Sequence, residues 1–205
     1  TFNVALTATN TVSVNGAYDI STASFVQNFS VLTQENYPTG LVFNNDGTKM
    51  YVIGDAGNDI NEYSLSTAFD LSTASYVQNF SVSSQESSPS GLAFNNDGTK
   101  MFIIGYSGDD VNEYSLSTAF DVSSASFAGN SESFSLASQE SNPSGIAFNN
   151  DGTKMFIVGY SGDDVNEYSL STAFDVSTSN YIQNFSVAAQ DNNPSGMSFN
   201  SDGTK

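Results

Sequence analysis

The chain contains no cysteine, no histidine and no arginine, and its only basic side chains are four lysines. Without cysteine there is no disulfide framework, no thiolate nucleophile and no thiolate metal site. Without histidine the usual general base near neutral pH and the common zinc sites are missing. Without arginine no side chain can clamp a carboxylate or phosphate in bidentate fashion. This inventory excludes most catalytic constellations and predicts a protein that is not an enzyme.

Positive charge is scarce as well, because 4 basic residues stand against 22 acidic ones, for a net charge of -18. A nucleic-acid partner needs a basic stripe that displaces counterions from phosphate, so this class is excluded. No apolar run approaches the length of a membrane span, which predicts no membrane insertion. A strongly negative surface keeps a protein soluble in salty water. We therefore expect an extracellular, cell-surface or virion-surface location.

What the sequence has in abundance is repetition. The phrase Phe-Asn-Asn-Asp-Gly-Thr-Lys stands at 43–49, 94–100 and 148–154, and a variant with serine in third place stands at 199–205. Longer phrases recur between these copies, and one interval is extended by extra residues near 129–132. Self-similarity at a fixed period of about 50 residues is the sequence signature of a repeat architecture.

Each copy is predicted to form four short strands. In the copy that opens at Pro89, residues 91–94 are apolar, and Asn96-Asp97-Gly98 supplies a hairpin turn signal. Residues 101–104 form a second apolar strand, residues 111–116 form a third, and a looser fourth strand follows. Four antiparallel strands in about 50 residues are typical of one β-propeller blade.

We therefore predict an all-β fold, a single small β-propeller domain over residues 1–205 with four blades of four antiparallel strands. The expected repeat units are residues 1–37 plus 194–205, 38–88, 89–142 and 143–193. One blade is shared between the N- and C-termini, since the last copy stops before its second strand and residues 1–6 supply one. A strand at 196–199 is expected to join that blade and close the ring. A slice of a longer array would show the same phase, and this alternative stays open.

The stretch 89–105, Pro-Ser-Gly-Leu-Ala-Phe-Asn-Asn-Asp-Gly-Thr-Lys-Met-Phe-Ile-Ile-Gly, is followed by Val-Asn-Glu-Tyr-Ser-Leu at 111–116. It resembles lactonase-like and YVTN-type propeller repeats. The wording around 116–127 is similar to repeats in surface proteins of marine bacteria and in proteins of their phages. The resemblance implies the propeller fold. Its lactonase branch implies histidine or a metal-binding Glu, Asn and Asp set in the central channel, and this chain contains no histidine.

Acidic and aromatic residues recur in the predicted loops of one face. One set precedes the innermost strands and the other lies between second and third strands. Rings of like charge attract cations, and an aromatic ring beside carboxylates suits sugar hydroxyls. The predicted ligand-binding residues are Glu35, Glu86, Glu140, Asp191, Tyr106 and Tyr160. The predicted metal ligands are Asp59, Asp109, Asp110, Asp163 and Asp164. The alternative is that these are solvated loop carboxylates copied by duplication.

Together these features predict a non-catalytic, secreted module for binding, adhesion or structural display, with a protein or glycan on a surface as its partner. No cofactor is expected, with Ca²⁺ as the one candidate ion. The chain is expected to belong to a larger chain or assembly. Two alternatives remain open, a lactonase-like metal-dependent hydrolase and a structural spacer or filament subunit.

Overall fold

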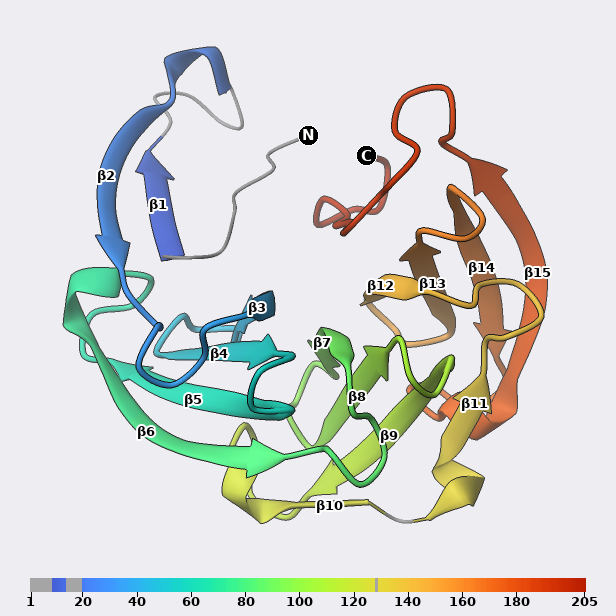
Figure 1. The fold of residues 1–205 in the computed structure, drawn as a ribbon, viewed down its shortest axis with the longest axis horizontal. Coiled ribbons are helices and arrows are strands. Elements are labelled where there is room, and N and C mark those ends of the chain that lie inside the picture. Colours follow the sequence, from blue (N-terminus) through green and yellow to red (C-terminus); the bar gives the residue numbers. More distant parts are fainter. Residues whose placement is uncertain (1–8, 14–19, 128) are drawn as a thin grey trace.

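Strands and short turns make up the regular structure of the computed structural model, which describes residues 9–13, 20–127 and 129–205. Three large antiparallel sheets follow one another along the chain as an arc of blades (Figure 1). In the described part of the chain no helix is long and apolar enough to cross a membrane. The predicted all-β fold, a small β-propeller, is confirmed.

Each sheet is one repeat unit whose strands pair with their neighbours in chain order. The first complete blade consists of β3 (Pro38–Phe43), β4 (Lys49–Gly54), β5 (Asp59–Leu65) and β6 (Ala74–Ser81). The second consists of β7 (Pro89–Phe94), β8 (Lys100–Gly105), β9 (Asp110–Leu116), β10 (Ala125–Phe127) and β11 (Ser133–Ser135). The third consists of β12 (Pro143–Phe148), β13 (Lys154–Gly159), β14 (Asp164–Leu170) and β15 (Ser179–Ser186).

Single-turn 3-10 helices connect the third strand of a unit to the fourth. They are η1 (Ile20–Thr22), η2 (Leu71–Thr73), η3 (Val122–Ser124) and η5 (Val176–Thr178). The extra residues of the second blade form a further turn, η4 (Asn130–Glu132), which divides its fourth strand into β10 and β11. Both pieces still pair with β9, so the insertion changes the outer edge of the blade and leaves its ladder in place.

The hairpin between the first two strands of each blade is closed by the Asn-Asp-Gly turn. Asp97 Oδ1 accepts hydrogen bonds from the hydroxyl of Thr99 at 2.6 Å and from its backbone N–H at 3.0 Å, and these bonds lower the pKa of Asp97. Gly98 has a φ of +71°, and a Cβ there would come within 2.3 Å of the Phe120 ring. Only glycine meets both demands without strain.

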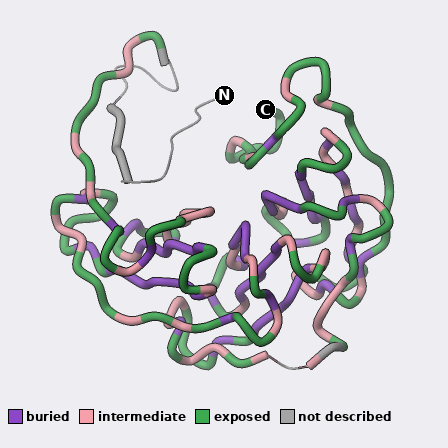
Figure 2. Tube along the Cα trace, viewed as in Figure 1, coloured by how far each residue is buried: buried purple, intermediate pink, exposed green. Residues whose placement is uncertain are grey.

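Many residues of the second and third strands are buried (Figure 2). Their apolar side chains lie between neighbouring blades and form the core. A phenylalanine of each of the fourth strands β2, β6 and β11 also packs against a tyrosine of the next blade's third strand. The ring centroids are 5.5 Å apart for Phe29 and Tyr63, 5.7 Å for Phe80 and Tyr114, and 5.4 Å for Phe134 and Tyr168. The repeated sequence therefore builds a repeated interface between blades.

Two hydrogen bonds also recur between the inner strands of adjacent blades. The first joins a hydroxyl to a proline carbonyl: Thr39 to Pro89 at 2.8 Å, Ser90 to Pro143 at 2.5 Å and Ser144 to Pro194 at 2.7 Å. The second joins an amide to a turn carbonyl: Asn45 to Asn96, Asn96 to Asn150 and Asn150 to Ser201. Residues 194–205 therefore occupy the place of the first strand of a further blade.

The fourth unit lies at both ends of the described chain. β1 (Thr9–Ser13) and β2 (Ser24–Phe29) pair with each other and pack beside the β3–β6 blade, while residues 194–205 lie against the third blade. Within the described residues no strand is assigned at 196–199. The expected ladder partner, residues 1–6, lies outside the described residues, so the predicted closure of the ring stays a prediction.

Candidate functional site

Glu35, Glu86 and Glu140 lie beneath the loops of one face, where they are only 1%, 1% and 0% exposed. Each carboxylate accepts three backbone hydrogen bonds. For Glu86 the donors are Ser88 N–H at 2.7 Å, Ser107 N–H at 3.1 Å and Gly108 N–H at 3.1 Å. The same pattern recurs at the other two glutamates.

Each glutamate thereby ties the loop before the innermost strand to the loop between the second and third strands, so both loops lie on one face. A Cβ on Gly105 would come within 2.2 Å of Glu86 Cδ, which explains the glycine that ends β8. The sequence pattern predicts these carboxylates on one rim, either as ligands or as solvated groups. In the structure they hold the loops together, and their binding role stays a prediction.

Asp191 is the shorter counterpart in the fourth unit. It is partly exposed, and its Oδ1 accepts the backbone N–H of Asn193 at 2.9 Å. Among the described residues Asp191 thus accepts one backbone hydrogen bond, where each of its glutamate counterparts accepts three.

The five aspartates expected to bind a metal are distributed over three blades. Asp59, Asp110 and Asp164 begin third strands, and asparagine amides donate to all three. Burial raises the pKa of Asp59 and Asp110. Asp109 and Asp163 lie one residue before a third strand, each with a φ of 49°. No three of the five approach one another within metal-binding range in the described structure. A calcium site built from them therefore stays a prediction.

Tyr106 and Tyr160 come from equivalent loops of adjacent blades and stack on each other, with centroids 5.8 Å apart and planes 23° from parallel. Burial first, and then the neighbouring Tyr160 hydroxyl, raise the pKa of Tyr106. Tyr160 is 36% exposed, so one edge of the pair faces solvent. The structure thus brings together two of the residues that the sequence analysis selected for ligand binding.

Asp55 holds the equivalent position in the first complete blade. Its Oδ1 accepts the hydroxyl of Ser88 at 2.6 Å. We call Asp55, Tyr106 and Tyr160 the loop row. Exposed hydroxyls and an amide border this row, and they bond to each other in the pairs Ser87–Ser107, Ser141–Ser161 and Asn142–Ser161. The loop row therefore offers an aromatic edge, a carboxylate and several hydroxyls on one surface.

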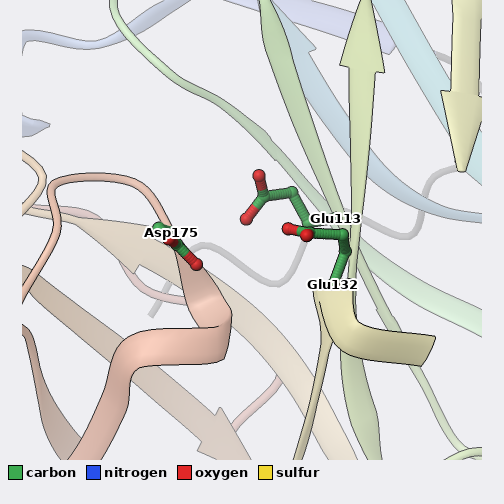
Figure 3. A group of neighbouring side chains, drawn as sticks. All are labelled: Glu113, Glu132 and Asp175. Carbon is green, nitrogen blue, oxygen red and sulfur yellow. The ribbon is translucent and has the colours of Figure 1, made fainter. Parts of the chain in front are cut away.

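A different acidic group lies between the second and third blades. One oxygen each of Glu113, Glu132 and Asp175 lies within 4.8 Å of the others (Figure 3). Glu113 is 3% exposed, and its Oε1 pairs with Lys100 Nζ at 2.5 Å. Its Oε2 accepts the backbone N–H of Val176 at 3.1 Å. Burial raises the pKa of Glu113, and the charge of Glu132 adds to this effect.

At the preceding interface, between the first and second blades, an amide lies between the two equivalent carboxylates. There the Gln78 amide donates to Glu62 at 2.9 Å and to Asp121 at 2.7 Å, and so bridges the two carboxylates. Gln78 directly precedes Asn79, which pairs with Asn61. Glu132 likewise precedes Ser133, which pairs with Asn112. Glu132 therefore holds the position of Gln78, and its carboxylate replaces the bridging amide. The insertion at 129–132 is visible in the sequence, but this acidic group was not predicted from it, and the missing Gln-Asn-Phe-Ser phrase was the available signal.

No protein-family model matches the chain, and no curated protein matches it either. Several solved structures are similar to it. A candidate 6-phosphogluconolactonase from Bacteroides fragilis shares 13% identity at a TM-score of 0.54, over 83% of this chain and 43% of its own. The periplasmic gluconolactonase PpgL of Pseudomonas aeruginosa shares 14% at 0.52, over 73% and 40%. Hydrazine synthase of Kuenenia stuttgartiensis shares 14% at 0.56, over 88% and 44%.

These similarities correct one prediction. The prediction that the chain is not an enzyme, which rests on the missing histidine, cysteine and arginine, is wrong, because similar structures include proteins named as lactonases. An inventory of residue types cannot exclude chemistry that a fold performs with carboxylates, hydroxyls and amides. The chain spans less than half the length of these structures. At such low identity the comparison establishes the β-propeller fold alone.

Proposed function

We propose that the face carrying the loop row binds a polyhydroxylated ligand of the carbohydrate class. The observation that carries this proposal is the stacked pair of Tyr106 and Tyr160, which joins two blades and keeps an exposed edge. A buried glutamate beneath each loop holds the backbone in place, which limits the ordering cost of binding.

The surroundings of the pair suit such a ligand. A sugar presents apolar C–H faces to an aromatic ring and hydroxyls to polar groups. Asp55 accepts hydrogen bonds, while Ser107 and Ser161 both donate and accept them. Two of the similar structures carry the names of gluconolactonases, whose names imply a sugar lactone. We place the ligand on a cell or virion surface, in keeping with the charge of -18.

The test is a binding titration with a panel of neutral monosaccharides, sugar acids and sugar lactones, with lactone hydrolysis followed in parallel. The Tyr106→Ala, Tyr160→Ala double variant should bind at least about tenfold more weakly, which corresponds to about 1.4 kcal/mol. Tyr181→Ala is the matched control, because Tyr181 is 40% exposed on the outer strand β15. Absence of binding by every member of the panel, or equal losses in both variants, would refute the proposal.

A further inference from the structure

The loop row carries a negative charge whose carboxylate has an unused oxygen. Asp55 is exposed, and among the described residues only its Oδ1 accepts a hydrogen bond, from the Ser88 hydroxyl at 2.6 Å. Burial and the neighbouring Tyr160 raise the pKa of Tyr106, and the charge of Asp55 adds to both effects. The Asp55 carboxylate therefore lies within electrostatic range of the tyrosine pair.

No basic side chain accompanies this carboxylate. Three lysines begin second strands, directly after the hairpin turns, and each pairs with a glutamate of its own blade: Lys49 with Glu62, Lys100 with Glu113 and Lys154 with Glu167. The fourth, Lys205, closes the last of these turns, and the chain contains no arginine and no histidine. Every basic side chain therefore lies on the face of the hairpin turns, at the opposite ends of the strands from the loop row.

The length of a strand separates these two faces. Lys100 begins β8 and Tyr106 directly follows its last residue, so the two lie about 20 Å apart along the strand at about 3.3 Å per residue. This distance exceeds the Debye length of about 8 Å at physiological ionic strength. Asp109 and Asp163, in the same loops as the two tyrosines, are partly exposed and add to the negative charge. The lysines therefore leave the charge of the loop row uncompensated.

The loops of the row also hold no free place for an anion. An anion is bound by basic side chains or by a concavity of backbone N–H groups. The backbone N–H groups of both tyrosine loops already donate to buried glutamates: Ser107 and Gly108 to Glu86, and Ser161 and Gly162 to Glu140. A phosphate or carboxylate at the loop row would therefore meet the charge of Asp55 without a compensating partner.

We infer that the ligand of the loop row is an amino sugar, a carbohydrate that carries a protonated amino group. This inference rests on the proposed function and adds the charge of the ligand to it. The ammonium group would donate to the free oxygen of Asp55, and a hydrogen bond between charged groups is about twice as strong as one between neutral groups. The hydroxyls of the sugar would meet Ser107 and Ser161, and its C–H groups would meet the exposed edge of the tyrosine pair.

The experiment is a calorimetric titration with sugars that share a ring and differ in charge: glucose, glucosamine, N-acetylglucosamine and glucose 6-phosphate, with galactose and galactosamine as a second pair. The pH is about 6, where an amino group carries its proton. An ionic strength of about 0.15 M screens the general attraction of cations to a chain with a net charge of -18. Each amino sugar should bind at least about tenfold more tightly than its neutral parent, which corresponds to about 1.4 kcal/mol. N-acetylglucosamine should bind like glucose, and glucose 6-phosphate should bind more weakly.

Asp55→Asn should abolish the preference for the amino sugars. Asp97→Asn is the matched control, because Asp97 is exposed on a hairpin turn and its replacement removes the same charge, so this variant should keep the preference. Sugar binding without the preference, a preference that survives Asp55→Asn, or an equal loss in Asp97→Asn would overturn the inference and leave the proposed function standing. Tighter binding of glucose 6-phosphate than of glucose would do the same. Absence of binding by all of these sugars would overturn both.

Discussion

Replacing Glu132 by glutamine should stabilise the protein. In the wild type, three carboxylates meet between the second and third blades, and only Glu113 has a lysine partner there. The variant restores the amide that Gln78 supplies at the preceding interface, where it donates to both carboxylates. A hydrogen bond to a charged group contributes about 1.5–3 kcal/mol, so we expect a gain of about 2 kcal/mol, or about 4–8 °C in Tm for a chain of this size.

The pH dependence should change as well. Because burial and Glu132 raise the pKa of Glu113 in the folded state, the native protein binds more protons than the unfolded chain just above the usual pKa of a glutamate. Stability linked to Glu113 is therefore present at lower pH and is lost as pH rises through the raised pKa. Glu132→Gln removes the contribution of the neighbouring charge, so this loss should become smaller.

The assay is thermal and urea unfolding of the two proteins between acidic and neutral pH. Gln78→Glu is the converse variant, which creates the same acidic group at the preceding interface and should destabilise by a similar amount. A Glu132→Gln variant that is no more stable than the wild type at neutral pH would refute the reasoning. Equal pH profiles for the two proteins would refute the part that concerns Glu113.

Three further predictions concern the loops and the residues that hold them. Glu86→Gln should lower the free energy of unfolding by about 3 kcal/mol in denaturant, because the buried carboxylate that accepts three N–H bonds loses its charge. This loss of stability should be equal with and without calcium. A loss seen only with calcium would instead support a metal at this glutamate. Gly105→Ala should lower Tm more than Gly196→Ala, because a Cβ at Gly105 meets Glu86 while one at Gly196 meets nothing within 4 Å, and equal effects would contradict the packing. Melting at matched ionic strength in sodium, magnesium or calcium should give identical curves if the loop aspartates bind no metal, whereas a saturable rise specific to calcium would establish such a site.

The repeat made the blades predictable, because the Asp-Gly turn, the apolar second strand and the third strand are each local signals. The pairing of second and third strands follows from them, as in β8 and β9. The shared blade was harder to predict, since its two parts come from opposite ends of the sequence. No strand is assigned at 196–199, and the expected partner of that strand lies outside the described residues.

The candidate site was likewise predictable only in part. Sequence pattern selected Tyr106 and Tyr160, which the fold stacks, because adjacent copies of one loop must lie on adjacent blades. It did not predict that Glu86 and its counterparts are buried, because only the three-dimensional path of the next loop shows that backbone N–H groups surround the carboxylate. It also missed Glu132, whose importance appears only against the Gln78 bridge.

The claim that the loop row binds a carbohydrate is tested most directly by nuclear magnetic resonance of the aromatic rings during a sugar titration. The chain has ten tyrosines, and Tyr→Phe variants assign their ring signals. We predict saturable shifts confined to Tyr106 and Tyr160, with saturation transfer from these rings to the ligand. Unchanged signals across the panel, or shifts at Tyr76 and Tyr181 on the outer strands instead, would contradict the claim.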